Sequence, residues 1–457
     1  MTDTVYDMVI LGAGSGGYAA ALRGAQLGLR VALIEADKIG GTCLHRGCVP
    51  TKAILHSAET AEAVREAAAV GVRAAYQGLD MPAVQRYKNG VISRMYKGLQ
   101  GLVASRGIEV VGGWGRLLAR DTVEVSGRRY RGRNIVLASG SLSKTMGQEI
   151  SGPVMTSDQV LELDHVPASA VVLGGGVIGV ELASAWASMG SRVTIIEALP
   201  HLVPNEDEAI SKQLERAFRK RRIAFRTSTM FESVERTAAG VTVRTADGRT
   251  HDAEVLLIAV GRGPATANLG YEEVGVAMDR GFVLTDDYGR TNVEGVWAVG
   301  DIVPGVQLAH RGFAQGITVA EKIAGLDPRP VDDALVPKVT FCEPEIASVG
   351  LSEARAAELH GAENVTTSEF NVAGNAKSQI LGTQGFVKLV SLKDGPIVGF
   401  HAIGARMGEQ VGEGQLIVSW EADAHDVASL VHAHPTQNET IGEAAMVLAG
   451  KPLHNHG

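Results

Sequence analysis

Two cysteines stand five residues apart in a short segment near the N-terminus. Cys43 and Cys48 belong to a stretch that runs from Gly40 to Lys52. Five residues of regular helix rise about 7.5 Å, which exceeds the roughly 7 Å that a disulfide tolerates between Cα atoms. A bond between the two cysteines therefore needs a distorted backbone, which Gly47 and Pro50 permit. We interpret the pair as a redox disulfide that opens and closes, because ordinary thiols of intracellular proteins stay reduced.

The residues before this segment have the pattern of a dinucleotide-binding unit. An apolar strand at 8–11 runs into Gly12, Gly14 and Gly17, an alanine-rich helix follows, and a second strand ends at Glu35, 23 residues after Gly12. Strand, glycines, helix, strand and acid in this order are far more specific than the glycines alone. The glycines let a pyrophosphate approach the backbone at the helix N-terminus, and the acid accepts a hydrogen bond from a ribose hydroxyl.

The same pattern returns in the middle of the chain. A strand at 170–173 leads into Gly174, Gly176 and Gly179, and the next strand ends at Glu197, again 23 residues after the first glycine. A carboxylate at this place suits a free 2′-hydroxyl and repels a 2′-phosphate, and no arginine occurs in the five residues that follow. The second unit is therefore predicted to prefer NAD over NADP.

The two units differ in length, and the cysteines lie in the difference. Each unit has a later strand that ends in glycine, at Gly140 and Gly261, which lie 128 and 87 residues beyond the first glycine of their unit. The first unit thus carries 41 extra residues, and these include the cysteine segment. A flavin is the natural relay between a dithiol and a nicotinamide. Because the cysteines belong to the first unit, we place FAD there and NAD on the second unit.

Composition and charge narrow the class of protein. The chain has 457 residues and a formal net charge of −8, which argues against a general nucleic-acid binder. A basic run at 219–222 follows a helical pattern and is interpreted as a solvated helix C-terminus. No signal peptide is visible, and no apolar segment reaches the roughly 18 residues of a membrane span. We therefore expect a cytoplasmic protein without membrane contact.

Three motifs together resemble the flavin-dependent disulfide reductases: the segment at 40–52, the double glycine fingerprint, and the segment from His434 to Glu439. Within that family the similarity is greatest to the dihydrolipoamide dehydrogenases, and it spans nearly the whole chain. The resemblance implies an α/β fold with two Rossmann-like dinucleotide-binding domains, for FAD and NAD, and an α+β C-terminal dimerisation domain. The implied domains are an FAD-binding domain with the redox disulfide at 1–150, an NAD-binding domain at 151–265, a second FAD-binding or central segment at 266–335, and the dimerisation domain at 336–457.

The resemblance also implies roles for single residues. Cys43 would meet the substrate, and Cys48 would lie near the flavin. Lys52, one helical turn beyond Cys48, would sit by the flavin ring nitrogen, with Glu181 as its ion-pair partner near the nicotinamide; without the motif, Lys52 would be read as a solvated helix lysine. Further flavin contacts implied are Gly41, Thr42, Gly115, Ser139, Gly140, Asp301, Leu308, Ala309 and His310.

His434 and Glu439 have both a structural and a catalytic interpretation. Thr436 and Glu439 have the spacing of a capping box, so the glutamate could tie down a helix start. A carboxylate held in this way can also orient an imidazole, as in a nucleophile, base and orienter arrangement. We predict that His434 is the general base, contributed by the second subunit of a homodimer, as the resemblance implies. His432 is interpreted as structural.

The activity that the resemblance implies is the oxidation of protein-bound dihydrolipoamide to lipoamide by NAD⁺, through the Cys43–Cys48 disulfide and FAD, without a metal. The implied partner is a lipoyl-bearing acyltransferase or a glycine-cleavage carrier protein. A mycothione-type reductase, or another NAD(P)H-dependent disulfide reductase, shares the core motifs and stays an alternative. Quinone reductases of the family often lack the cysteines or the base, and both are present here. A role as an assembly subunit alone would not need them together.

Overall fold

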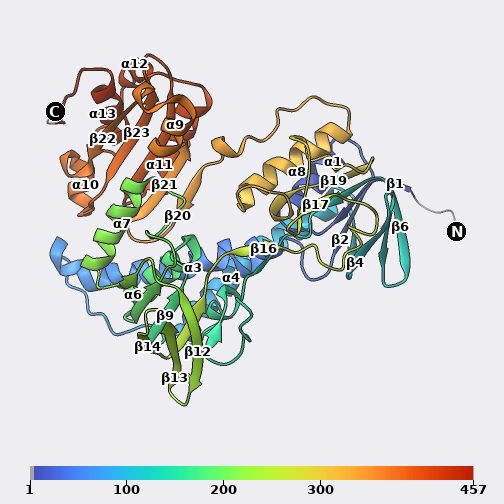
Figure 1. Ribbon diagram of the computed structural model, residues 1–457, viewed down its shortest axis with the longest axis horizontal. Helices are drawn as coiled ribbons and strands as arrows, with labels where there is room; N and C mark the ends of the chain where they lie inside the picture. The colour runs from blue at the N-terminus through green and yellow to red at the C-terminus, as the bar shows by residue number, and fades with distance from the viewer. Residues whose placement is uncertain (1–4, 456–457) are drawn as a thin grey trace.

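In a computed structural model, residues 5–455 are described, and they form three bodies that Figure 1 shows at the right, at the lower centre and at the upper left. The body at the right is built on a sheet with the order β3-β2-β1-β6-β5-β4, and β19 adds to β6. The sheet strands are β1 (Val5–Leu11), β2 (Val31–Glu35), β3 (Glu109–Gly112), β4 (Gly115–Ala119), β5 (Thr122–Val125), β6 (Arg128–Leu137) and β19 (Val296–Ala298).

Strand β19 comes from a distant part of the chain. It pairs in parallel with β6, so that Trp297 lies opposite Val136, whereas β4, β5 and β6 are antiparallel. Helix α8 (Ala309–Ile323) follows β19 and packs against α1 (Ser15–Gln26), the helix of the first glycine fingerprint. The contact is close because it uses small residues: a Cβ on Gly316 would lie 2.3 Å from the Gly16 carbonyl oxygen. The segment after the second unit thus returns to the first.

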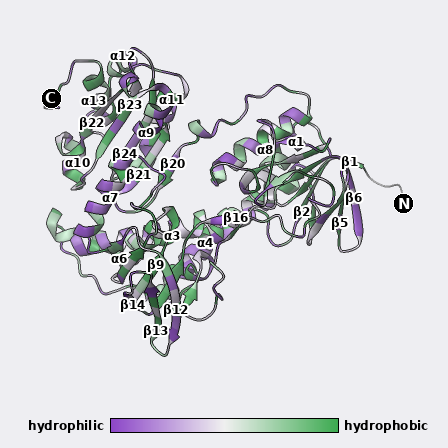
Figure 2. Cartoon of the chain, viewed as in Figure 1, coloured by the Kyte–Doolittle hydropathy of each residue, from purple (hydrophilic) through white to green (hydrophobic). Residues whose placement is uncertain are grey.

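The second unit repeats the parallel sheet. Its strand order is β11-β10-β9-β15-β8, and a three-stranded antiparallel sheet, β12-β13-β14, lies beside it. Figure 2 colours strands near β9 green, for hydrophobic, and much of the β12–β13 hairpin purple. The elements are β8 (Val154–Met155), α5 (Ser157–Val160), β9 (Ser169–Leu173), α6 (Val177–Met189), β10 (Arg192–Ile196), α7 (Glu208–Lys220), β11 (Ala224–Arg226), β12 (Phe231–Thr237), β13 (Gly240–Thr245), β14 (Thr250–Ala253) and β15 (Val255–Ile258).

The extra residues of the first unit form helices that reach toward the second. These are α2 (Gly41–Arg46), α3 (Cys48–Glu66) and α4 (Met81–Ser105). The apolar face of α3, with Ile54, Leu55 and Ala58, belongs to one buried core with residues of α6 such as Val180 and Ala183. Burial of this face against α6 holds the cysteine segment between the two units.

The C-terminal body has an antiparallel sheet with the order β20-β21-β24-β23-β22. Residues 324–337 connect it to α8. Its elements are β20 (Lys338–Thr340), β21 (Glu345–Gly350), α9 (Glu353–His360), β22 (Val365–Asn371), α10 (Ala376–Leu381), β23 (Phe386–Leu392), β24 (Ile397–Gly404), α11 (Met407–Ser419), α12 (Ala424–Ala428) and α13 (Glu439–Leu448). Short pieces complete the fold: β7 (Ser141–Ser143) pairs with β16 (Arg262–Pro264), and β17 (Met278–Asp279) pairs with β18 (Phe282–Val283).

This architecture confirms the predicted fold class, with two parallel Rossmann-like sheets and an antiparallel C-terminal domain. The boundaries between the four predicted segments remain a prediction. Within residues 5–455, the helices are all too short or too polar to cross a membrane. The basic run at 219–222 does end a helix, but its interpretation as solvated is wrong for Arg221. That side chain is only 15% exposed and pairs with Glu62 at 3.1 Å, because α7 ends against α3.

Candidate active site

The backbone between the two cysteines is broken at Gly47. Helix α2 ends at Arg46, Gly47 has φ −138° and ψ −106°, and α3 begins at Cys48. This break is the distortion that the five-residue spacing required. Both cysteines are free thiols in the structure, joined by a hydrogen bond between their side chains, with Cys43 half-buried and Cys48 exposed.

The hydrogen bond divides the two thiols into a donor and an acceptor. Donation from the Cys43 thiol, helped by the charge of Lys52, lowers the pKa of Cys48 to about 7. Although Cys48 as a residue is exposed, protein atoms around its sulfur partly desolvate it, and this acts in the opposite direction. The same hydrogen bond, together with burial, raises the pKa of Cys43. Of the two thiols, Cys48 is therefore the one that ionises first as the pH rises through about 7, while Cys43 stays protonated.

Lys52 lies on α3 and pairs with Glu181 on α6. Its Nζ donates to both carboxylate oxygens, at 3.0 and 2.8 Å. Glu181 is 3% exposed and Lys52 is 35% exposed. Glu181 also accepts a hydrogen bond from the backbone N–H of Phe341, at 2.9 Å. The ion pair thus joins the cysteine helix, the second unit and the C-terminal domain. The sequence offers no sign of the Phe341 contact.

The two glycine fingerprints have the same three-dimensional form. Gly12 and Gly174 have φ near +100°, and a Cβ on either would lie 2.2 or 2.4 Å from the carbonyl oxygen of Ala138 or Ala259. A Cβ on Gly17 or Gly179 would lie 1.9 or 2.0 Å from the carbonyl oxygen of the first glycine. These four positions therefore exclude any side chain.

The acid that closes each unit holds the glycine loop. Glu35 accepts hydrogen bonds from the backbone N–H groups of Ala13 (2.8 Å) and Asp37 (2.9 Å). Glu197 does the same with Gly175 (2.6 Å) and Leu199 (2.7 Å). This role as a loop anchor was not apparent from the sequence, which indicated only a contact to ribose.

Both helices that follow the fingerprints begin without a side-chain cap. Gly14 and Gly176 are the N-cap residues of α1 and α6, neither cap makes a side-chain hydrogen bond, and neither first turn has an acidic residue. A Cβ on either glycine would meet nothing within 4 Å. The free N–H groups and the positive end of each helix dipole face this open side, so both sites fit a dinucleotide pyrophosphate.

Several predicted flavin contacts gather around the first loop. Gly41 meets it directly, since a Cβ there would lie 2.6 Å from the Gly14 Cα, and Thr42 follows in α2. Ser139 accepts from the Tyr271 hydroxyl at 3.0 Å, and Asp301 accepts from Ser141. Leu308, Ala309 and His310 form the start of α8, beside α1, and Gly140 (φ +77°) precedes β7.

Two predicted glycines have different surroundings. Gly115 lies in β4 against the core, because a Cβ there would meet the Leu11 and Ile34 side chains at 2.5 and 3.0 Å. Packing alone explains this glycine. Gly261 (φ +104°) has nothing near its Cβ position and lies just beyond β15, at the edge where the second sheet ends.

His434 and Glu439 form a hydrogen-bonded pair at the start of α13. The His434 Nδ1 lies 2.7 Å from a Glu439 carboxylate oxygen, and the other oxygen accepts from the Thr436 N–H at 2.7 Å. Although burial works against them, these contacts hold the pKa of Glu439 below its usual value. The predicted capping box is only half formed, because Asn438 is the N-cap residue and the Thr436 hydroxyl donates to the Ala433 carbonyl oxygen.

The imidazole of His434 is 70% exposed. Among residues 5–455, no hydrogen bond or ion pair links His434 or Glu439 to the cysteines. His432 pairs instead with Glu413, at 2.7 Å. Tertiary contacts of a single chain thus bring Lys52 and Glu181 together with the cysteine segment, but leave the predicted base on a separate surface.

Comparisons with known proteins agree over nearly the whole chain. The model of the pyridine nucleotide-disulphide oxidoreductase family matches residues 6–316, and the model of the dimerisation domain of that family matches residues 336–445. A dihydrolipoyl dehydrogenase of Bacillus subtilis is 37% identical over 473 residues, covering 99% of this chain and 99% of the relative. The mitochondrial dihydrolipoyl dehydrogenase 2 of Arabidopsis thaliana is 36% identical, covering 98% of this chain and 91% of the relative.

Two solved structures are similar along their full length. LpdA from Mycobacterium tuberculosis has a TM-score of 0.90 at 27% identity, covering 96% of this chain and 99% of that chain. The HOCl-induced flavoprotein disulfide reductase RclA from Escherichia coli has a TM-score of 0.87 at 27% identity, covering 97% of this chain and 100% of that chain.

Proposed function

The chain belongs to the pyridine nucleotide-disulphide oxidoreductase family, and on this basis we propose that it is a dihydrolipoyl dehydrogenase. The family consists of flavoprotein oxidoreductases with a redox-active cysteine pair, a pyridine nucleotide and a dimerisation domain. The proposed reaction is the oxidation of protein-bound dihydrolipoamide by NAD⁺. The observation that carries the proposal is the Cys43–Cys48 pair between two nucleotide-binding units, in a chain that is 37% identical over its full length to an enzyme of this activity.

The two units divide the cofactors between them. In the proposal, Gly12, Gly14, Gly17 and Glu35 hold FAD, together with Gly41, Thr42, Ser139, Gly140, Asp301 and the start of α8. Gly174, Gly176, Gly179, Glu197 and Gly261 hold the nicotinamide dinucleotide. When bound, FAD would supply two-electron exchange between the dithiol and the nicotinamide. Gly115 supports this region through packing.

Cys43 is the proposed point of attack by the substrate. In the oxidised enzyme, His434 removes a proton from one substrate thiol, and the resulting thiolate attacks the Cys43 sulfur, so that the Cys43–Cys48 bond breaks and Cys48 leaves as a thiolate. Lys52 stabilises that leaving thiolate. The second substrate thiol then attacks the substrate sulfur that is bonded to Cys43. The bond to Cys43 breaks, so lipoamide is released and Cys43 is left reduced. Glu439 orients the imidazole of His434 and stabilises its protonated form.

A homodimer would bring His434 and the cysteine pair together, since no hydrogen bond or ion pair joins them within residues 5–455 of one chain. The dimerisation domain of the family covers 336–445, which includes both His434 and Glu439. The base is exposed in the single chain, and the apolar side chains of Leu430 and Val431, just before it, are exposed as well. We propose that the His434 of one subunit faces the Cys43 of the other.

The structure of the second unit supports NAD as the coenzyme. Glu197 is buried and fixed at the end of β10 by two backbone N–H groups, so its charge stays where a ribose 2′ position would lie. A 2′-phosphate there would meet a fixed carboxylate and no arginine in the five residues after it. The proposed partner that carries the lipoyl group is an acyltransferase of a 2-oxo acid dehydrogenase or a glycine-cleavage carrier protein, and the proposed location is the cytoplasm.

A second candidate function is that of another disulfide reductase. The similarity to RclA, a flavoprotein disulfide reductase, favours it. A mycothione-type reductase would use the same electron path in reverse, from the nicotinamide to the cysteines, whereas a quinone reductase would not need the cysteine pair. The His434–Glu439 pair weighs toward a dithiol substrate, because a quinone has no thiol proton to remove.

Steady-state NADH formation by the purified protein tests the proposal. The assay uses dihydrolipoamide with NAD⁺, and compares NADP⁺ as acceptor and mycothiol disulfide as an alternative substrate. Rapid turnover with NAD⁺ alone is expected. Cys43→Ser should abolish this turnover and leave a bound flavin that NADH still reduces. Absence of dihydrolipoamide oxidation by the wild-type protein, with NADH still reducing the flavin, would move the substrate to another disulfide or to a quinone.

A further inference from the structure

The Lys52–Glu181 pair has an anchor outside both nucleotide-binding units. Phe341 lies in the turn between β20 and β21 of the C-terminal domain. Its backbone N–H donates to Glu181 at 2.9 Å, and its ring centroid lies 4.6 Å from Lys52 Nζ. One residue of the dimerisation domain therefore contacts both members of the pair.

Lys52 is the member that needs a second contact. Glu181 is fixed by burial, whereas Lys52 ends a flexible four-carbon stem and is 35% exposed. A carboxylate alone lets the ammonium group turn toward water while it keeps one hydrogen bond. An aromatic face on a second side attracts the cation and narrows the positions that Nζ can take.

Phe341 is itself held from several directions. The turn is tied to α6, because the Glu343 N–H donates to the Ser184 hydroxyl at 3.0 Å and Arg221 donates to the Glu343 carbonyl oxygen at 2.8 Å. On the other side, a Cβ on Gly408 of α11 would lie 3.6 Å from a ring carbon of Phe341. The ring thus has a fixed position relative to the dimerisation domain.

We propose that Phe341 is a positioning residue of the redox centre, which holds Lys52 and Glu181 so that a fixed positive charge stays one helical turn from Cys48. The inference rests on the proposed function for the use of Cys48, but its geometry belongs to this chain alone. Through Phe341, the placement of the dimerisation domain determines the charge beside the thiolate.

The consequence is a change in the acidity of Cys48. The charge of Lys52 favours the Cys48 thiolate. With Phe341→Leu, apolar packing is largely kept, but the cation loses the aromatic face and turns toward water. The pKa of Cys48 should therefore rise, and by no more than it rises when the charge of Lys52 is removed altogether. Phe341→Tyr keeps an aromatic face and should restore the value.

The experiment titrates Cys48 in the full-length dimer. In a Cys43→Ser background, Cys48 is the thiol that titrates near neutral pH, because Cys342 is buried and its pKa is raised by that burial. Ultraviolet thiolate absorbance is followed against pH, with Cys43→Ser/Cys48→Ser as the blank. Phe341→Leu should shift the titration to higher pH, and Phe341→Tyr should not.

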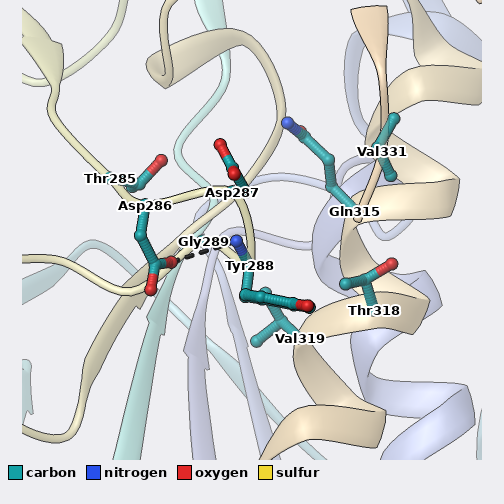
Figure 3. A pocket seen from close by; sticks show the side chains of 9 residues that line it. All are labelled: Thr285, Asp286, Asp287, Tyr288, Gly289, Gln315, Thr318, Val319 and Val331. Carbon is teal, nitrogen blue, oxygen red and sulfur yellow. Dashed lines mark hydrogen bonds between the residues drawn. The ribbon is translucent and has the colours of Figure 1, made fainter. Parts of the chain in front are cut away.

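A matched control exists at a distance from the cysteines. Lys322 Nζ lies 4.3 Å from the ring centroid of Tyr288 and pairs with Asp327 at 2.8 Å, so it too has a ring and a carboxylate. Figure 3 shows Tyr288 in its loop beside Thr318 and Val319 of α8. Tyr288→Leu removes the same kind of contact and should leave the Cys48 titration unchanged.

A double variant separates positioning from general damage. Lys52→Gln alone should raise the pKa of Cys48, and adding Phe341→Leu should raise it no further, because the ring acts through the lysine. An unchanged titration in Phe341→Leu, or an additional shift in the double variant, would overturn the proposal. No substrate is used in this titration, so its outcome is independent of whether the wild-type protein oxidises dihydrolipoamide.

Discussion

Breaking the Lys52–Glu181 pair from its two sides is expected to cost unequal amounts of folding free energy. Glu181 is 3% exposed, and Lys52 is 35% exposed. In Lys52→Met, the only donor left to the buried carboxylate among residues 5–455 is the Phe341 N–H, at 2.9 Å. Removal of one partner from a fully buried pair costs about 3–5 kcal/mol. Because water reaches the lysine side, we scale this to about 2–3 kcal/mol for Lys52→Met.

Replacement of the glutamate instead of the lysine leaves no unpaired charge in the interior. Glu181→Gln keeps an acceptor for the Phe341 N–H, and the free ammonium of Lys52 can reach water while it keeps its contact with the Phe341 ring. The expected cost is about 1 kcal/mol or less. The double variant Lys52→Met/Glu181→Gln removes the stranded charge, so it should be about 1–2 kcal/mol more stable than Lys52→Met alone.

Denaturant and thermal unfolding at fixed protein and flavin concentrations measure these differences, since bound cofactor and dimerisation both shift the midpoint. The control is Arg120→Met, which breaks the exposed pair of Arg120 (64% exposed) with Glu294 (90% exposed) and should cost less than about 0.5 kcal/mol. The reasoning is refuted if Glu181→Gln is as destabilising as Lys52→Met, or if the double variant loses the sum of the two single losses.

Three further predictions concern cofactor binding and the thiol chemistry. Gly12→Ala should give protein that purifies without flavin, whereas Gly174→Ala should keep the yellow flavin and lose NADH binding, because each Cβ would overlap a carbonyl oxygen at 2.2 or 2.4 Å. Flavin absorbance and titration with NADH measure the two effects. Equal loss of flavin in both variants would contradict the division of cofactors between the two units. His434→Gln should lower kcat for dihydrolipoamide oxidation about 10²–10⁴-fold, and Glu439→Gln should lower it by less. Reduction of the flavin by NADH should be unaffected in both variants. An unchanged kcat in His434→Gln would exclude His434 as the base. The pKa of Cys48 is lowered to about 7, so its thiolate is present above that pH and lost below it. The rate of alkylation of Cys48 in the reduced protein should therefore rise with pH, with a midpoint near 7. A midpoint near the ordinary value of about 8.5 would contradict the hydrogen bond from Cys43.

Much of the candidate site could be read from local spacing. The glycines of both fingerprints follow a strand directly, and their structural requirement is set by the next few residues, as the matching overlaps at Gly12 and Gly174 show. The cysteine spacing predicted a broken helix, and Gly47 provides the break. The half-formed capping box at Thr436 shows the limit of this reasoning. The Thr436 N–H does donate to Glu439, but the helix begins only at Glu439 with Asn438 as its N-cap, so the Thr436 hydroxyl does not cap it and donates to the Ala433 carbonyl oxygen.

The sequence by itself determined the fold class, the duplicated nucleotide-binding pattern and the cysteine pair, because these depend on residues close together in the chain. The pairing of Lys52 with Glu181, 129 residues away, was implied only by the family resemblance, and only the tertiary structure decided that Phe341 reaches Glu181 across 160 residues. No pattern of neighbouring residues in the sequence indicates such contacts. They arise because the apolar face of α3 packs against α6 and the C-terminal sheet packs against both, which brings polar groups together. A buried carboxylate at that junction then has to find partners, and the packing of three domains determines which ones it finds.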